Sequence, residues 1–226
     1  DLSEVFKNFL SFNGFKGEIV ENKYIIHGKR AHAMQPNLGM NAAFILANFL
    51  NEHIDNDFVK YIVDYLSFDH LGEKLNISHY DSEMKDFTMN PGTFDYENGR
   101  FTIGINCRYP KGWDKDSATI NIEASVKKYR FKQNVLNDMP VHYVEKDDEL
   151  VQTLHEAYIK YTGDTETELM TIGGGTYSRA LKKAVAFGPT MPGRKDVAHQ
   201  IDEHMYIDDL LKATAIYMES IYQLTK

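Results

Sequence analysis

The first residues that could do chemistry lie where a predicted strand passes into a predicted helix. The run Gly28–Pro36 contains His32 near the end of the strand, and Gly39–Ala42 follows it. This place in the chain puts His32 at the rim of a sheet, where side chains face a cleft. An imidazole there can donate a hydrogen bond to a carbonyl oxygen that gains negative charge during a reaction. The alternative is a partly buried histidine that packs against the helix.

Arg108 closes another predicted strand and is followed by Tyr109 and Pro110, which stop it. Side chains alternate between the two faces of a strand. The core face should therefore carry Phe101, Ile103, Ile105 and Cys107, and the other face Thr102, Gly104, Asn106 and Arg108. An arginine at a strand end could hold a carboxylate through two parallel hydrogen bonds. An ordinary solvated arginine is the alternative.

The glycine run Gly173–Gly175 precedes Thr176, between a predicted strand and a predicted short helix. Such a turn exposes backbone N–H groups and lets a ligand approach closely. The run lacks the Lys-Ser/Thr ending of a phosphate loop and does not match GxGxxG. A plain tight turn is the alternative.

His199 lies in a predicted loop just before the last helix, with Asp202 and Glu203 close behind it. A loop histidine with nearby carboxylates suits a metal ligand and its supporting hydrogen bonds. His204 comes five residues later, which is the wrong spacing for two ligands on one helical face, and HExxH is absent. The alternative is a surface histidine without a ligand.

The composition narrows the class of protein. The chain has 226 residues, 42% of them hydrophobic and 26% charged, and a net charge of -8. No basic patch appears, so a nucleic-acid partner is not expected, and the apolar runs are too short to span a membrane. Cys107 is the only cysteine. This excludes an internal disulfide and a cysteine-based zinc site, and it favours a cytoplasmic protein.

The elements that must position these residues suggest an α+β first part. Helices are expected at 3–13, 37–52, 57–68 and 115–127, and strands at 19–21, 24–33, 84–96, 100–109 and 129–135. The Asn98-Gly99 pair predicts a hairpin turn between two of these strands. This order predicts an open sheet with helices on one face. Because the chain opens at Asp1 directly before an amphipathic helix, we expect a truncated or processed start; removal of a first methionine is the alternative.

A boundary is expected at 137–146, and the pattern then changes. The second part should contain a helix from Asp147 to Gly163, strands Glu168–Ile172 and Ala184–Phe187 around a short helix, and a long last helix from Asp208. The apolar face of that last helix should carry Leu211, Ala215, Met218 and Tyr222. Strands and helices alternating over so short a stretch indicate part of an α/β domain.

Taken in order, these motifs resemble the PepV-type and carnosinase-like dipeptidases of the co-catalytic metallopeptidases that include aminoacylases. The resemblance covers essentially the whole chain and is most specific in Ala31–Ala42 and Gly173–Arg179. In that family a lid domain interrupts a catalytic domain. The resemblance implies that residues 1–140 are the later part of the lid and that 141–226 are the C-terminal segment of an α/β catalytic domain.

The resemblance also implies a role for each motif. His32 would reach the active site and stabilise the oxyanion, and Arg108 would hold the terminal carboxylate of a dipeptide substrate. The backbone of Gly174, Gly175 and Thr176 would line the substrate pocket. His199 would bind one of two divalent metal ions, zinc or manganese.

The remaining metal ligands of that family have no match in this chain. They are an upstream His-x-Asp, a Glu-Glu pair that includes the general base, and a further Asp. We expect them in a missing N-terminal part of the same protein, and we expect this chain alone to be inactive. The implied function is hydrolysis of short peptides with a free C-terminus. The alternative is a non-catalytic α+β module that binds amino acids or mediates dimerisation.

Overall fold

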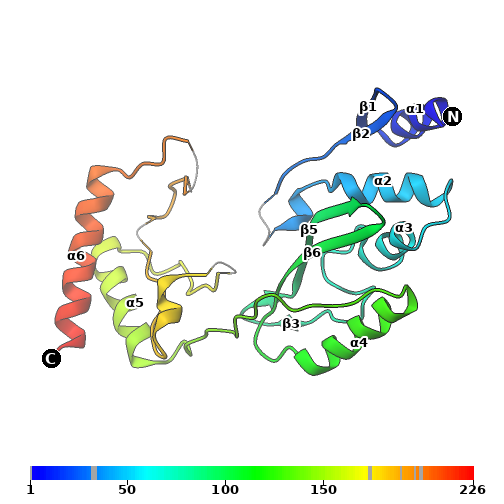
Figure 1. The fold of residues 1–226 in the computed structure, drawn as a ribbon. Coiled ribbons are helices and arrows are strands. Elements are labelled where there is room, and N and C mark those ends of the chain that lie inside the picture. The colour runs from blue at the N-terminus through cyan, green and yellow to red at the C-terminus, as the bar shows by residue number, and fades with distance from the viewer. Residues whose placement is uncertain (1, 32–34, 173–174, 189, 196, 199–200) are drawn as a thin grey trace. The chain divides into compact units, whose positions relative to one another are not determined.

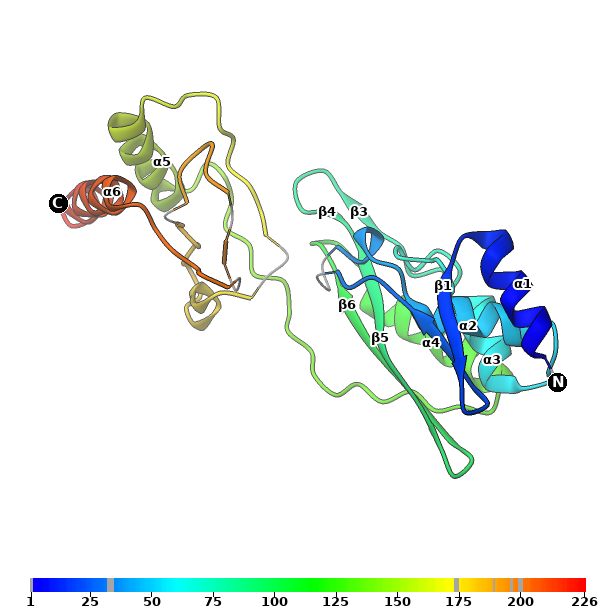
Figure 2. The same ribbon diagram turned by 90° about the horizontal axis from the view of Figure 1, so that it is seen from above.

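A computed structural model describes residues 2–31, 35–172, 175–188, 190–195, 197–198 and 201–226. The chain divides into two compact units, Asp1–Val141 and His142–Lys226, drawn in Figures 1 and 2. Helices are combined with small antiparallel sheets, so the predicted mixed α/β and α+β class is confirmed. The interpretation of the two parts as lid and catalytic segment stays a prediction.

The first unit begins with a helix and a hairpin. Its elements are α1 (Ser3–Asn13), β1 (Lys16–Val20), β2 (Lys23–His27), η1 (Pro36–Leu38), α2 (Ala42–Asn51), α3 (Asp57–Tyr61), η2 (Ile62–Leu66), β3 (Tyr80–Asp81), β4 (Lys85–Asp86), β5 (Thr88–Glu97), β6 (Arg100–Arg108) and α4 (Lys115–Lys128). The predicted turn is confirmed, because Asn98 (φ 51°) and Gly99 (φ 78°) are both left-handed.

The predicted single open sheet is not formed among the described residues. Their strands make three two-stranded antiparallel sheets, β1–β2, β3–β4 and β5–β6. The strand expected at 129–135 is also wrong. Arg130 adopts a left-handed conformation with φ 59° directly after α4, and no strand follows it in this unit. Phe131 instead packs its ring on Tyr61, with 5.4 Å between centroids.

The main core of the first unit lies between α2, α3, α4 and the β5–β6 hairpin, and Figure 2 shows these helices on one side of the hairpin. Phe44, Leu66, Phe87 and Met89 are fully buried there. A second cluster of Phe6, Leu10 and Phe49 joins α1 to α2. These aromatic and aliphatic side chains dominate the burial that holds the unit together.

The second unit contains α5 (Glu149–Thr162), η3 (Tyr177–Ala180) and α6 (Ile207–Leu224). Asp148 rather than Asp147 caps α5, and Gly163 ends it with φ 70°. α5 and α6 lie side by side (Figure 1) and pack through Ala157, Ala213 and Ile216.

Two expectations for this unit are wrong. None of the described residues of 142–226 lies in a strand, so Glu168–Ile172 and Ala184–Phe187 are not strands here. A strand exists only when another strand pairs with it. The last helix also buries the opposite face from the predicted one: Asp209, Ala213, Ile216 and Ser220 are buried, whereas Leu211 and Met218 are 64% and 67% exposed.

Within the described part of the chain, no helix has both the length and the apolar character needed to cross a membrane.

Candidate functional site

Arg108 ends β6, and the register of the β5–β6 hairpin decides which residues accompany it. Arg108 lies opposite Thr88, and two residues further along Asn106 lies opposite Asn90. The neighbouring pair, Met89 and Cys107, belongs to the other face and joins the core. The predicted alternation is therefore confirmed for Cys107 and Arg108.

A one-residue bulge in β5 sets this register. The pairing shifts between Pro91 and Thr93, which leaves Gly92 as the extra residue. Beyond the bulge Thr93 lies opposite Gly104, where an added Cβ would come 2.3 Å from Thr93 Oγ1. A side chain at position 104 would therefore collide with the Thr93 hydroxyl unless the Thr93 side chain moved.

The face of β5–β6 opposite the core carries four polar side chains side by side. We call Thr88, Asn90, Asn106 and Arg108 the polar row. Arg108 is half-buried, with its Nε atom buried, and Asn106 is exposed. A guanidinium, two amides and a hydroxyl supply several hydrogen-bond donors on one surface. Such a row can bind a carboxylate and an adjacent peptide group.

The chain directly after Arg108 is held in place. The Tyr109 hydroxyl donates a hydrogen bond to Asp138 Oδ1 at 2.6 Å, and the Tyr109 ring stacks on Trp113 with 4.6 Å between centroids. Trp113 Nε1 in turn donates to the Ile77 carbonyl at 2.8 Å. Hydrogen bonds from Lys115 and then from Tyr109 keep the pKa of Asp138 below its usual range. These contacts hold the backbone next to Arg108 in a fixed position.

His32 itself lies outside the described residues, but the segment around it is anchored at both ends. Lys29 and Met40 form an antiparallel bridge with two N–H···O bonds of 2.9 Å. Asn41 Oδ1 accepts from the Ala43 N–H at 3.0 Å, which caps α2, and Asn41 Nδ2 donates to the Pro91 carbonyl of β5 at 2.8 Å. Asn41 thus ties the His32 segment to the strand that carries Asn90.

Glycine is needed where this segment closes on itself. A Cβ added to Gly39 would lie 2.9 Å from the Lys29 carbonyl oxygen, and one added to Gly28 would lie 2.5 Å from the Met40 carbonyl oxygen. Pro36 is buried and begins the 3-10 turn. The local structure of this segment is therefore sufficient to explain Gly28, Pro36 and Gly39.

The glycine run of the second unit is partly described. Gly173 and Gly174 lie outside the described residues. Gly175 has open space around it, because an added Cβ would meet only Arg179 Cδ, at 4.0 Å. Thr176 Oγ1 and Ser178 Oγ share a hydrogen bond of 2.5 Å, and the Arg179 N–H donates to the Thr176 carbonyl at 3.2 Å. Packing within this unit therefore does not explain the glycine at 175.

His199 also lies outside the described residues. Downstream of it, His204 Nδ1 is 2.8 Å from the Asp202 carbonyl oxygen. Before it, Arg194 donates to Asp209 at 2.7 and 3.1 Å and lies over the Tyr206 ring at 3.9 Å. Among the residues that the structure describes, no group of three or more His, Cys, Asp or Glu side chains could hold a metal ion.

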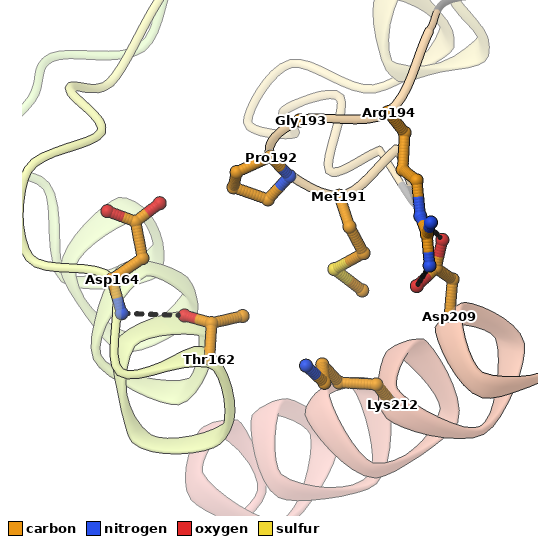
Figure 3. A pocket seen from close by; sticks show the side chains of 8 residues that line it. All are labelled: Thr162, Asp164, Met191, Pro192, Gly193, Arg194, Asp209 and Lys212. Atoms are coloured by element: carbon orange, nitrogen blue, oxygen red, sulfur yellow. Dashed lines mark hydrogen bonds and ion pairs between the residues drawn. The ribbon is translucent and has the colours of Figure 1, made fainter.

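A pocket of about 330 Å³ opens between α5, α6 and the turn at Pro192 (Figure 3). Its lining includes Asp164, the Arg194–Asp209 pair and Lys212; of the predicted site residues that the structure describes, Arg108, Gly175 and Thr176, none lines it. Hydrogen bonds from the Thr167 and Tyr158 side chains, and from the backbone N–H groups of Thr167 and Glu166, lower the pKa of Asp164. The Asp164 carboxylate thus accepts hydrogen bonds from its own loop, and the Asp209 carboxylate is paired with Arg194.

Sequence reasoning placed Asn106 beside Arg108 but missed Thr88, Asn90 and Asn41. Thr88 and Asn90 join the row only through the register of the hairpin, and Asn41 only through a contact 50 residues away. The position of Asn41 before an apolar helical run was a usable signal for its capping role.

Comparison with known proteins agrees with these motifs. Residues 25–223 match the family described as Peptidase family M20/M25/M40. The chain is 40% identical over 230 residues to the protein named "Putative dipeptidase YtjP" of Bacillus subtilis, covering 98% of this chain and 49% of that protein. It is 39% identical over 235 residues to a protein named "Putative dipeptidase" of Staphylococcus epidermidis, covering 99% and 50%.

The chain therefore spans about half the length of the curated relatives that it matches. The family match extends over most of the chain, and the identities are far above those of chance similarity. This chain belongs to the peptidase family M20/M25/M40.

Proposed function

We propose that this chain supplies the carboxylate-binding part of a dipeptidase, a hydrolase of short peptides with a free C-terminus. The observation that carries the proposal is the polar row, with Arg108 at the end of β6 and Asn106, Asn90 and Thr88 beside it. Family membership and the printed names of the relatives support the same reaction class. Because the relatives are about twice as long, the activity belongs to the full-length protein.

In this proposal Arg108 binds the terminal carboxylate of the substrate. The guanidinium is planar and can donate two parallel hydrogen bonds to a carboxylate, which fixes orientation as well as position. A carboxylate held at a fixed point sets the distance to the peptide bond that is cleaved. Longer peptides then place the wrong bond at the reaction centre, so the row would select dipeptides.

His32 is proposed to donate a hydrogen bond to the carbonyl oxygen that becomes negatively charged in the transition state. The anchors at Lys29, Met40 and Asn41 support this role, because a donor acts best when its segment is held in place. We also propose that the backbone of Gly174, Gly175 and Thr176 lines the substrate pocket. The open space around Gly175 supports this role.

Metal dependence is the finer part of the proposal. M20 peptidases are generally metal-dependent, and we propose His199 as one ligand of two zinc or manganese ions. The described residues alone do not provide a metal site. We propose that the other ligands and the general base lie outside this chain. We also propose a cytoplasmic location.

The test compares substrates that differ only in the terminal carboxylate. Arg108→Ala in the full-length protein should lower kcat/KM for a dipeptide by about 100-fold to 1000-fold, because two charge-assisted hydrogen bonds of about 1.5–2 kcal/mol each are lost. For the same dipeptide with a C-terminal amide, wild type and variant should differ by less than about threefold. Arg108→Lys, which keeps the charge but not the planar fork, should lie between them.

Two results would contradict the proposal. If Arg108→Ala lowered kcat/KM equally for the dipeptide and for its C-terminal amide, Arg108 would not bind the substrate carboxylate. Absence of any hydrolysis by the wild-type full-length protein, with zinc or manganese added, would favour a non-catalytic module that binds amino acids or mediates dimers.

A further inference from the structure

The residues just after Arg108 hold the end of β6 at the place where its backbone pairing stops. The last pair in the β5–β6 register joins Thr88 to Arg108, and β6 ends there. Successive side chains of a strand point to opposite faces. Tyr109 accordingly packs against the main core, as Cys107 does, whereas Arg108 lies in the polar row. The direction of the Arg108 side chain therefore depends on how firmly Tyr109 is held.

Tyr109 is held from two directions. Its ring stacks on Trp113, and the Trp113 ring stacks in turn on the fully buried Phe87, with 5.4 Å between centroids. The Tyr109 hydroxyl donates to Asp138 Oδ1 at 2.6 Å and lies 3.2 Å from the Met139 carbonyl oxygen. The stack fixes the plane of the ring and the hydrogen bond fixes its outer end, so the ring cannot tilt without weakening one of the two contacts.

Asp138 is itself fixed by polar bonds. The side chains of 134–140 are exposed, so burial contributes little to holding this stretch against the unit. Asp138 Oδ2 accepts a hydrogen bond from Lys115 Nζ at 2.5 Å, and Lys115 is the first residue of α4. Hydrogen bonds to a charged carboxylate are stronger than those to a neutral acceptor. The Asp138 carboxylate therefore joins the end of β6 to the start of α4.

We propose that Tyr109 and Asp138 are positioning residues for Arg108: the hydrogen bond between them holds the end of β6 so that the guanidinium meets the substrate carboxylate in the correct orientation. In this role neither residue touches the substrate. The two parallel hydrogen bonds of an arginine–carboxylate pair must be aligned together, so a small tilt of the guanidinium weakens both. This inference rests on the carboxylate role of Arg108 proposed above.

A second Tyr–Asp–Lys trio in the same unit provides a matched control. The Tyr129 hydroxyl donates to Asp64 Oδ2, and Lys128 Nζ lies 3.4 Å from the same carboxylate oxygen. Tyr129 follows the last turn of α4, whereas Lys115 begins that helix. At 1.5 Å per residue the two trios lie about 20 Å apart along α4. Removing the Tyr129 hydroxyl therefore disturbs a similar contact without touching the strand end that carries Arg108.

Steady-state kinetics of the full-length protein on a dipeptide and on its C-terminal amide test the proposal. Tyr109→Phe keeps the ring and removes only the hydroxyl. It should lower kcat/KM for the acid by about tenfold, mainly through KM, and for the amide by less than about twofold. Tyr129→Phe should change kcat/KM by less than about twofold for both substrates. Asp138→Ala should act like Tyr109→Phe, and Asp138→Asn, which keeps an oxygen that can accept from Tyr109, should lose less.

Combining Tyr109→Phe with Arg108→Ala separates positioning from a general structural role. If Tyr109 acts through Arg108, the double variant should lie within about twofold of Arg108→Ala on the acid, because the orientation of an absent guanidinium no longer matters. An unchanged acid-to-amide ratio in Tyr109→Phe, or losses that multiply in the double variant, would overturn the proposal and leave the carboxylate role of Arg108 standing. If Arg108→Ala itself fails to distinguish acid from amide, both proposals fall.

Discussion

Replacing Asn41 with alanine should destabilise the Asp1–Val141 unit by more than the loss of a helix cap. Asn41 Oδ1 accepts the Ala43 N–H at 3.0 Å, and Nδ2 donates to the Pro91 carbonyl at 2.8 Å. Losing a cap costs about 1 kcal/mol, and losing a partly buried hydrogen bond costs about 0.5–1.5 kcal/mol more. The total of about 2 kcal/mol corresponds to a fall of roughly 6–8 °C in the midpoint of this unit.

Asn56 provides the matched control for this prediction. Its side chain caps α3 by accepting from Phe58 and Val59 at 2.9 and 3.2 Å. Asn56→Ala should therefore cost only the capping part, about 1 kcal/mol. Asn41→Asp keeps the cap but replaces the donor to Pro91 with a carboxylate oxygen that faces the Pro91 carbonyl oxygen, so it should cost at least the other part.

Trp113 makes the measurement selective. It is the only tryptophan in the chain and lies in the first unit, so its fluorescence during heating or urea unfolding reports on that unit alone. If Asn41→Ala proves no more destabilising than Asn56→Ala, the bond to β5 contributes nothing. Asn41 would then not anchor the His32 segment to β5.

Three further predictions concern the same chain. Gly104→Ala should cost about 1–3 kcal/mol, because the added Cβ meets Thr93 Oγ1, and Thr93→Ala in the same chain should restore most of the loss in urea unfolding; no rescue would refute the contact. Burial raises the pKa of the Cys107 thiol to about 11. Its alkylation at pH 8 should therefore be about 100-fold slower in the folded chain than in urea. The folded state then holds more protons than the unfolded state between the two pKa values, so the contribution of Cys107 to stability is present below the unfolded pKa and is lost as the pH rises toward 11; a stability independent of pH in this range after correction with Cys107→Ala would contradict it. Finally, the 226-residue chain with added zinc or manganese should release no amino acids from dipeptides, and measurable turnover by amino-acid analysis would show that the chain needs no further residues.

The hairpin shows how far the sequence alone can lead. Alternation correctly separates Cys107 from Arg108, and the Asn98-Gly99 pair correctly gives the turn. Continuing the register outward from that turn, however, would place Met89 opposite Arg108. The bulge at Gly92 shifts the pairing by one residue and brings Thr88 there instead. A bulge is visible in the sequence only as a glycine within a strand, which several other structures also explain.

The segment around His32 was predictable in its residue types and unpredictable in its attachment. Gly39, Pro36 and Asn41 each match a local requirement: a close backbone approach, the start of a turn and a helix cap. The hydrogen bond from Asn41 to Pro91 joins residues far apart in sequence. Such a contact depends on how α2 packs on β5, which local patterns do not encode.

Helix α6 is the case in which a correct pattern leads to the wrong face. The spacing of Leu211, Met218 and Tyr222 is that of a buried helix side, yet these residues are exposed. The buried side includes Asp209, whose charge is neutralised by Arg194 at 2.7 and 3.1 Å, and Ser220, whose hydroxyl donates to the Ile216 carbonyl at 2.8 Å. Periodicity shows where apolar residues gather but not which neighbour covers them. The contact with α5 buries Ala213 and Ile216, and the larger side chains of Leu211, Met218 and Tyr222 remain exposed.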